Sequence, residues 1–282
     1  MGAPTVRRRR LGAELRRLRE AAGLKLDDVQ ERTAINTVKA SRVETARTGV
    51  KAGDLDTLLD LYGVDDAAKR AVLHALARDG ARRGWWQTYS DTISPAYADL
   101  ISLEAQTKSV RTFQTTLIPG LLQTAAYARA TIDAINMTST PDRVHTLVEV
   151  RVARQSVLTR PDPPELRAII HEVALRPQLG DPHVMREQLQ KLLDVQDLPH
   201  VCVQVLPLTA SPHPGMAGPF TILGFPETAD LDIALVEHLT SALYVEDPAE
   251  VSVYGSAFER LRAAALPFGR TTDLIAQLKD TL

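Results

Sequence analysis

The chain has 282 residues, of which 44% are hydrophobic and 24% are charged, a composition that excludes a disordered chain and provides for two compact domains. No apolar run approaches the roughly 18–20 residues of a membrane helix, and the single cysteine, Cys202, excludes an internal disulfide framework, so we expect a cytoplasmic protein with no membrane partner. The formal net charge of −2 is unevenly distributed along the chain. Residues 1–53 contain 13 Lys and Arg against 6 Asp and Glu, a net charge of +7. The other 229 residues therefore carry a net charge of −9.

The first predicted helix covers about residues 6–22, where apolar residues recur at helical spacing. The stretch that follows, residues 23–47, is predicted to form two short helices joined by a tight turn. Its corner is Ala34-Ile35, and Asn36 is a good N-cap for the second helix because its side-chain oxygen accepts a hydrogen bond from a backbone N–H. Two helices with one apolar face each and a short corner between them are typical of a helix-turn-helix.

This stretch resembles the helix-turn-helix of the phage-repressor (Xre-type) family, whose S-R-I/V-E signature is matched by Ser41-Arg42-Val43-Glu44. The resemblance implies DNA binding through the second of the two helices. Carried over position by position, Arg19 and Glu44 correspond to a charged pair that ties the first helix to this recognition helix. The residues that the resemblance places at the DNA are Asn36, Thr37, Val38, Lys39, Ser41, Arg42 and Arg47.

Three of these residues, Thr37, Val38 and Arg42, correspond to positions that read bases in the family. One departure concerns the end of the recognition helix, where Ala46 replaces a Gly that the family usually has at this position. Because alanine rarely adopts the left-handed conformation of a helix end, we expect the C-cap to be delayed to Gly49.

The charge distribution favours the same interpretation. A basic module joined to an acidic body is expected when one domain contacts a polyanion, since phosphate neutralisation supplies most non-specific affinity for DNA. Taken alone, the run from Arg7 to Arg10 is equally typical of a solvated tail. Next to a helix-turn-helix, it favours double-stranded DNA as a partner.

Two further helices complete the first domain. Asp54 is expected to cap the helix in LDTLLDLYGV, and another helix is expected over about residues 67–80. A polar, Gly-containing stretch follows, so we place a linker at residues 81–95. The first domain, residues 1–80, is therefore predicted to be an all-α bundle of five helices.

The second domain, residues 96–282, is predicted to be α+β, with its strands covered by helices on at least one face. It begins with a helix over about residues 96–114, in which Val110 and Phe113 continue an apolar face. The remaining elements are expected in the order helix (121–134), helix (141–159), strand (166–171), helix (182–195), strands (near 200–206, 219–225, 232–237 and 242–246) and helices (248–265 and 270–281).

Two details of the predicted sheet region bear on function. Cys202 lies in the run VCVQVL, where a buried strand residue is more frequent than a reactive thiol. Segment 207–219 contains four Pro and two Gly, a composition that excludes regular structure. It is either a lid or partner-binding loop or a wide surface connection.

Four short runs of the second domain are distinctive: Ile118-Pro119-Gly120-Leu121-Leu122-Gln123-Thr124, Tyr127-Ala128-Arg129, Arg154-Gln155 and Glu172-Val173-Ala174-Leu175. In these runs the domain resembles the C-terminal region of actinobacterial helix-turn-helix regulators, which are described as antitoxin-like and are commonly encoded beside a small partner protein. The acidic balance of the residues after 53 and the Pro-rich segment 207–219 favour binding of such a small partner protein by the second domain.

No pattern in the sequence predicts an enzyme. The chain lacks GxSxG, GxxxxGK[ST] and HExxH motifs, so we expect no catalytic residue, no cofactor and no metal. His171-Glu172 and Glu237-His238 are the only suggestive pairs, and each lies at the end of a predicted strand, where a structural role is more frequent. A metal site shared between the two pairs is left open as an alternative.

These observations predict a sequence-specific DNA-binding transcriptional regulator that is associated with the nucleoid. One module covers only a half-site, so we expect a homodimer, held through the second domain because the +7 modules repel one another. In this interpretation the second domain receives a regulatory signal or a partner. The alternative is an antitoxin-like interaction module that binds a small partner protein and uses DNA binding for autoregulation.

Overall fold

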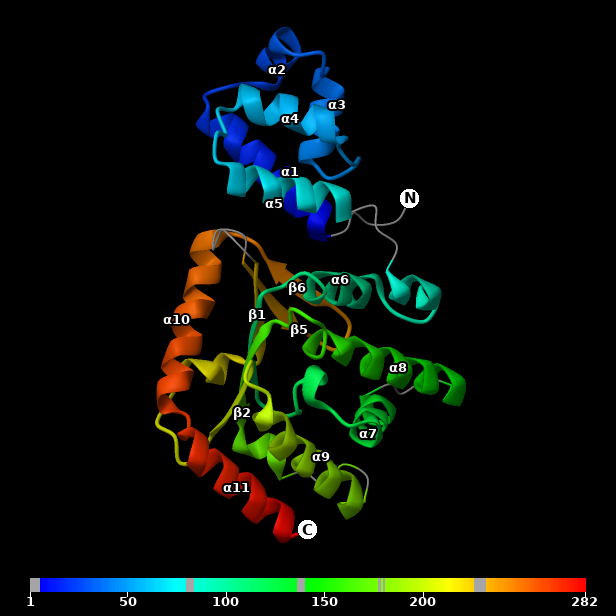
Figure 1. Cartoon of the computed structure of the whole chain (residues 1–282), viewed down its shortest axis with the longest axis vertical. Coiled ribbons are helices and arrows are strands. Elements are labelled where there is room, and N and C mark those ends of the chain that lie inside the picture. The colour runs from blue at the N-terminus through cyan, green and yellow to red at the C-terminus, as the bar shows by residue number, and fades with distance from the viewer. Residues whose placement is uncertain (1–5, 80–83, 136–139, 177–178, 180, 226–231) are drawn as a thin grey trace. The chain divides into compact units, whose positions relative to one another are not determined.

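A computed structural model of the chain describes residues 6–79, 84–135, 140–176, 179, 181–225 and 232–282. These residues divide into two compact units, the first ending at Gln87 and the second beginning at Thr88. The first unit is helical, and the second combines helices with a mixed sheet (Figure 1). The predicted fold class, an all-α bundle followed by an α+β domain, is confirmed. No helix of the described residues is long and apolar enough to span a membrane.

The first unit consists of α1 (Val6–Ala21), α2 (Leu26–Arg32), α3 (Thr37–Glu44), α4 (Ala52–Leu61) and α5 (Ala67–Asp79). Each helix contributes to one shared apolar core, because its apolar residues recur three and four positions apart and so lie on one face. The core residues that solvent does not reach at all are Leu15, Val29, Leu55, Leu59 and Leu73.

Helix α1 approaches the backbone of α3 at Gly12, a buried glycine in the interior of α1. A Cβ atom at this position would lie 2.5 Å from the carbonyl oxygen of Glu44 and 2.6 Å from that of Val43. Backbone carbonyls in a packed helix cannot move aside, so only glycine allows this approach. The end of α3 is thereby held directly against α1.

The expected N-cap of α4 is wrong. Helix α4 begins at Ala52 with Lys51 as its N-cap, three residues earlier than the sequence predicts. The carboxylate of Asp54 does not cap the helix but accepts a hydrogen bond from the Nζ of Lys39 at 2.7 Å. Asp54 still lies in the first turn of α4, where a negative charge is favourable.

The second unit is built on one six-stranded sheet in the order β3-β2-β1-β4-β5-β6. Strands β1, β2 and β3 run parallel, while β4, β5 and β6 pair in antiparallel fashion from β1 outward. The strands are β1 (Ser109–Gln114), β2 (Glu165–His171), β3 (Val201–Leu206), β4 (Phe220–Gly224), β5 (Ile233–Glu237) and β6 (Ala242–Val245).

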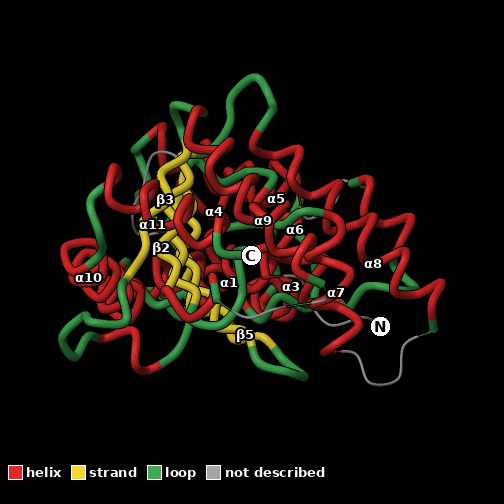
Figure 2. The backbone as a smooth tube through the Cα atoms, turned by 90° about the horizontal axis from the view of Figure 1, so that it is seen from below, coloured by secondary structure: helices red, strands yellow, loops and turns green. Residues whose placement is uncertain are grey.

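Helices cover both faces of this sheet (Figure 2). Helix α10 (Pro248–Ala264) packs Phe258 and Leu261 against Phe113 and Phe220 of one face. The other face meets α6 (Pro95–Glu104) and α8 (Pro141–Arg154), and the remaining helices are α7 (Ala125–Ile135), α9 (Pro182–Asp194) and α11 (Phe268–Asp280). Since every strand contributes alternate residues to two covered faces, the central strands are apolar on both sides.

The predicted helix over residues 96–114 is wrong in its second half. Helix α6 ends at Glu104, and Ser109–Gln114 is the central strand β1. Val110 and Phe113 are three positions apart, which fits a helix, but both are buried because the two faces of β1 are both covered. Cys202 lies in β3 and is half-buried rather than buried. The Pro-rich segment 207–219 contains a short 3-10 helix, Pro214–Ala217, although the sequence predicts no regular structure there.

Three of the four short runs of the second domain contribute to a polar network around the 3-10 helix η2 (Gly120–Leu122), while the fourth, Glu172–Leu175, forms the 3-10 helix η4 after β2. The backbone carbonyl of Gln123 accepts hydrogen bonds from the Nε2 of Gln155 at 2.7 Å and from the Nζ of Lys191 at 2.8 Å. The hydroxyl of Tyr127 accepts a hydrogen bond from the backbone N–H of Ile118 at 3.2 Å. These side chains satisfy buried backbone groups where the chain leaves the sheet, which is a structural role.

Candidate nucleic-acid interface

The turn between α2 and α3 is fixed by one hydroxyl and one apolar side chain. The Oγ1 of Thr33 donates to the carbonyl oxygen of Val29 at 2.6 Å and accepts from the N–H of Ile35 at 3.1 Å. Ile35 is 3% exposed and belongs to the core of the first unit. The corner therefore cannot open without exposing an isoleucine to water.

The N-terminus of α3 is held by two polar side chains. Asn36 is the N-cap, and its Oδ1 accepts a hydrogen bond from the N–H of Lys39 at 2.8 Å. The Oε1 of Gln30, in α2, lies 3.1 Å from the backbone N of Thr37 and 3.3 Å from its hydroxyl, and accepts from both. Gln30 is not identifiable from the sequence, because its role depends on how α2 crosses α3 and leaves no local pattern.

The expected C-cap at Gly49 is wrong. Helix α3 ends at Glu44 with Thr45 as its C-cap, and Ala46 has a φ of +59°, the only positive φ of a non-glycine residue in the described ranges. The N–H of Ala46 bonds to the carbonyl of Val43 at 3.0 Å, and that of Arg47 bonds to the carbonyl of Arg42 at 2.8 Å. This pair of bonds is a Schellman motif. It satisfies two helix-end carbonyls, which offsets the strain of alanine in the left-handed region.

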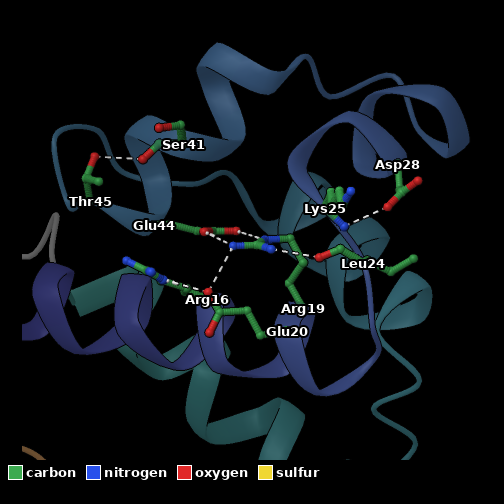
Figure 3. A network of polar contacts seen from close by, with 9 residues as sticks. All are labelled: Arg16, Arg19, Glu20, Leu24, Lys25, Asp28, Ser41, Glu44 and Thr45. Carbon is green, nitrogen blue, oxygen red and sulfur yellow. Dashed lines mark hydrogen bonds and ion pairs between the residues drawn. The ribbon is translucent and has the colours of Figure 1, made fainter.

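Arg19 of α1 and Glu44 of α3 form a bidentate ion pair (Figure 3). The Nε and Nη2 atoms of Arg19 donate to the two carboxylate oxygens of Glu44 at 2.7 and 2.9 Å, and Nη1 donates to the carbonyl of Leu24 at 2.7 Å. The side chains are only 9% and 7% exposed. The hydrogen bonds that Arg19 donates to Glu44 raise the pKa of Arg19 above its usual value. The guanidinium therefore stays charged, and the pair ties the end of α3 to α1.

The outer face of α3 is accessible along its length, while Ala40 and Val43 on the inner face are buried. Val38 is 58% exposed, which is unusual for a branched apolar side chain. Asn36, Arg42 and Arg47 are exposed, and Thr37, Lys39 and Ser41 are half-buried. All the residues that the sequence analysis assigns to DNA therefore lie on or immediately beside one helix.

The cations near α3 differ in their partners. The Nζ of Lys39 lies 2.7 Å from the carboxylate of Asp54, which neutralises its charge. No ion pair within the described part of the chain involves Arg42 or Arg47. The two guanidinium groups are therefore available for a ligand, whereas Lys39 must first leave Asp54. The described residues contain no group of three His, Cys, Asp or Glu side chains that could hold a metal ion.

Glu44→Gln tests how firmly the ion pair holds α3. The substitution keeps the shape of the side chain but leaves the guanidinium of Arg19 without its counter-charge in a buried site, so we expect a loss of about 3 kcal/mol in the stability of the first unit. Hydrogen–deuterium exchange of α1 and α3 peptides in the full chain measures the change. The matched control is Asp60→Asn, which removes an ion pair between an exposed carboxylate and Arg70 in the same unit, away from Arg19, and should leave these exchange rates unchanged. Equal rates in both variants would contradict the assignment.

Comparison with family models gives two matches. Residues 10–73 match the model described as a helix-turn-helix domain, a match that supports DNA binding and a role in transcription regulation. Residues 97–277, more than half of the chain, match the model described as a domain of unknown function, DUF5753. No curated protein and no solved structure searched matches the chain. The chain therefore belongs to the DUF5753 domain family and carries a helix-turn-helix domain ahead of the DUF5753 domain.

Proposed function

We propose that the chain is a transcriptional regulator that binds specific sequences of double-stranded DNA through α3. The main support for this proposal is that one face of α3 is fixed by contacts and the other is accessible to solvent. Its inner face and both ends are held by Gly12, Gln30 and the ion pair of Glu44. Its outer face presents an exposed Val38 and an unpaired Arg42. A rigid helix with accessible side chains is what the major groove of DNA admits.

Each exposed side chain of α3 has a role that fits its chemistry. The guanidinium of Arg42 suits bidentate hydrogen bonds to guanine O6 and N7, and the methyl groups of Thr37 and Val38 suit contact with thymine methyls. Phosphate contacts fall to the polar side chains around them, since such groups position a protein on the duplex without reading its sequence. These side chains are Asn36, Lys39, Ser41 and Arg47.

Arg42→Ala tests the assignment of base reading. The cognate site is first obtained by selection of the full chain on random duplexes. The substitution should then weaken binding to this site by about 1–3 kcal/mol and leave binding to random DNA nearly unchanged, because a bidentate contact with guanine discriminates between bases. The control is Arg262→Ala, which removes an exposed, ion-paired arginine of α10 and should change neither affinity. An equal loss on cognate and random DNA would refute a base-reading role.

We further propose that the chain acts as a homodimer on two half-sites. One helix-turn-helix covers a single half-site, and two recognition helices about 34 Å apart reach half-sites one helical turn apart. Because residues 1–53 carry +7, repulsion between the first units favours the second unit as the place of association. The small partner protein of the antitoxin-like alternative stays a prediction, and capture experiments with the full chain as bait would test it.

The half-site spacing gives the sharpest test of the dimer. Sedimentation of the full chain with its selected duplex should show two chains per duplex. Insertion of about five base pairs between the half-sites turns one of them by half a helical turn and should abolish simultaneous binding. One chain per duplex, with an affinity that does not depend on the spacing, would contradict the proposal.

A further inference from the structure

A cavity of about 40 Å³ lies inside the second unit, between the sheet face opposite α10 and the elements α6, η2 and α8. A single water requires about 10–15 Å³ of such space, so the cavity has room for a few waters or for one small polar group with a short stem. It is lined by Leu100, Glu104, Val110, Thr112, Gln114, Pro119, Gly120, Leu121, Arg154, Leu166, Thr221, Leu235 and Glu237.

The sheet side of the cavity carries polar side chains on an otherwise apolar face. Thr112 of β1 is paired with Thr221 of β4 in the sheet, and their hydroxyls are 2.9 Å apart. The Nε2 of Gln114 donates to the hydroxyl of Thr112 at 3.1 Å. Thr112 is 3% exposed, and apolar side chains such as Leu166 and Leu235 lie around these groups. Hydrogen-bonding groups therefore converge inside the cavity.

The helix side of the cavity carries two buried charges that are poorly satisfied. Glu104 of α6 is 3% exposed and Arg154 of α8 is 9% exposed. The Oε2 of Glu104 lies 2.8 Å from the Nε of Arg154, but the two atoms are not aligned for a hydrogen bond, and neither has another partner among the described residues. The Nη1 of Arg154 donates instead to the hydroxyl of Tyr97 at 3.1 Å. A buried carboxylate oxygen that accepts no hydrogen bond is unfavourable even beside a guanidinium.

The charge and shape of the lining select one class of ligand. Two carboxylates, Glu104 and Glu237, oppose the single guanidinium of Arg154, so the lining is negative when both carboxylates are ionised. This negative charge would repel a small anion. A cation with several N–H donors would complement both the carboxylates and the threonine hydroxyls, and an ammonium group offers three donors in a compact volume.

We propose that this cavity binds the ammonium group of a small organic amine, with Glu104 and Glu237 as its charged partners. The inference goes beyond DNA binding and does not depend on it, because the binding is measured without DNA. A failure here would leave the proposed function untouched.

The protonation state of Glu104 adds a second, independent readout. Burial raises the pKa of Glu104 to about 7, and the neighbouring Glu237 acts in the same direction. The ionised carboxylate is the form that binds a cation, so affinity should fall as the pH drops below about 7, by at most about tenfold for each pH unit. Among the described residues, four charged or titratable groups on neighbouring elements interact with Glu104: Arg151 and Arg154 of α8, Glu237 of β5 and Tyr244 of β6. Tyr97 of α6 acts on Arg154.

The experiment uses the full chain and ethylammonium chloride as the probe. Saturation-transfer NMR of the probe's methyl protons, titrated at pH 8 and pH 6, should show saturable binding that is tighter at pH 8. Ethanol and acetate, which match the probe in size but are neutral and anionic, should not bind. A fourth probe, Nα-acetyl-lysine amide, carries the same ammonium group on a protein-like stem. Tighter binding of this probe than of ethylammonium would assign the site to a lysine side chain of a protein and overturn the proposal.

Four variants locate the binding. Glu104→Gln should weaken ethylammonium binding about tenfold and remove its pH dependence, because it takes away one charge-assisted hydrogen bond. Glu237→Gln should weaken binding about fivefold, since Glu237 is exposed. Thr221→Val keeps the size of the side chain, removes one acceptor and should weaken binding a few-fold. Glu259→Gln, on the helix that covers the opposite sheet face, is the control and should change the affinity less than twofold.

Three further results would overturn the proposal. One is the absence of saturable ethylammonium binding to the unmodified chain at pH 8. Another is equal weakening by Glu259→Gln and Glu237→Gln, which would indicate only a general effect of charge. The third is binding that does not change between pH 6 and pH 8. If Glu104→Gln fails to fold, as judged by circular dichroism, Glu237→Gln and Thr221→Val still decide the outcome.

Discussion

Arg19 and Glu44 meet in a site where each side chain is less than a tenth exposed, and the position of α3 depends on this contact. Removing two charges from water is unfavourable, so a buried pair adds little stability compared with apolar side chains of similar volume. Its two parallel hydrogen bonds instead restrict geometry, because few rotations of α3 about its axis bring both oxygens of Glu44 to the fork of Arg19. Helix α3 has eight residues, too few for an isolated helix to be stable in water. Its direction is therefore set by contacts with α1 and α2, notably those of Gly12 and Gln30.

Local patterns in the sequence predict much of this arrangement. Asn36 and the apolar spacing predict the start and the inner face of α3, and the strands after β1 are predicted by apolar runs between Pro, Gly and Asp. Prediction of an element from the sequence fails where one local pattern fits two different structures. The spacing of Val110 and Phe113 fits one face of a helix, yet it also fits a strand covered on both sides. Ala46 disfavours a left-handed helix end, but two hydrogen bonds to α3 carbonyls outweigh this preference.

The remaining features depend on contacts between distant parts of the chain, and no single-sequence pattern contains them. Gln30 acts on Thr37 only because α2 crosses α3. The cavity of the second unit brings Glu104 next to Glu237 through the order of the strands, although 133 positions separate them in the sequence. Three of the short runs that carry the resemblance of the second domain meet around η2, and two of these supply part of the cavity wall through Gly120 and Arg154. These runs therefore both satisfy buried backbone groups around η2 and shape the wall of the cavity.

In the proposed complex, the outer face of α3 lies on the bases of DNA. Photo-cross-linking tests it most directly, with the full chain bound to its selected duplex and 5-bromouracil in place of thymine, followed by mass spectrometry of the cross-linked peptides. Cross-links are expected within residues 36–47, with Val38 and Arg42 in the modified peptide. Cross-links confined to α5 or to residues 88–282 would contradict it.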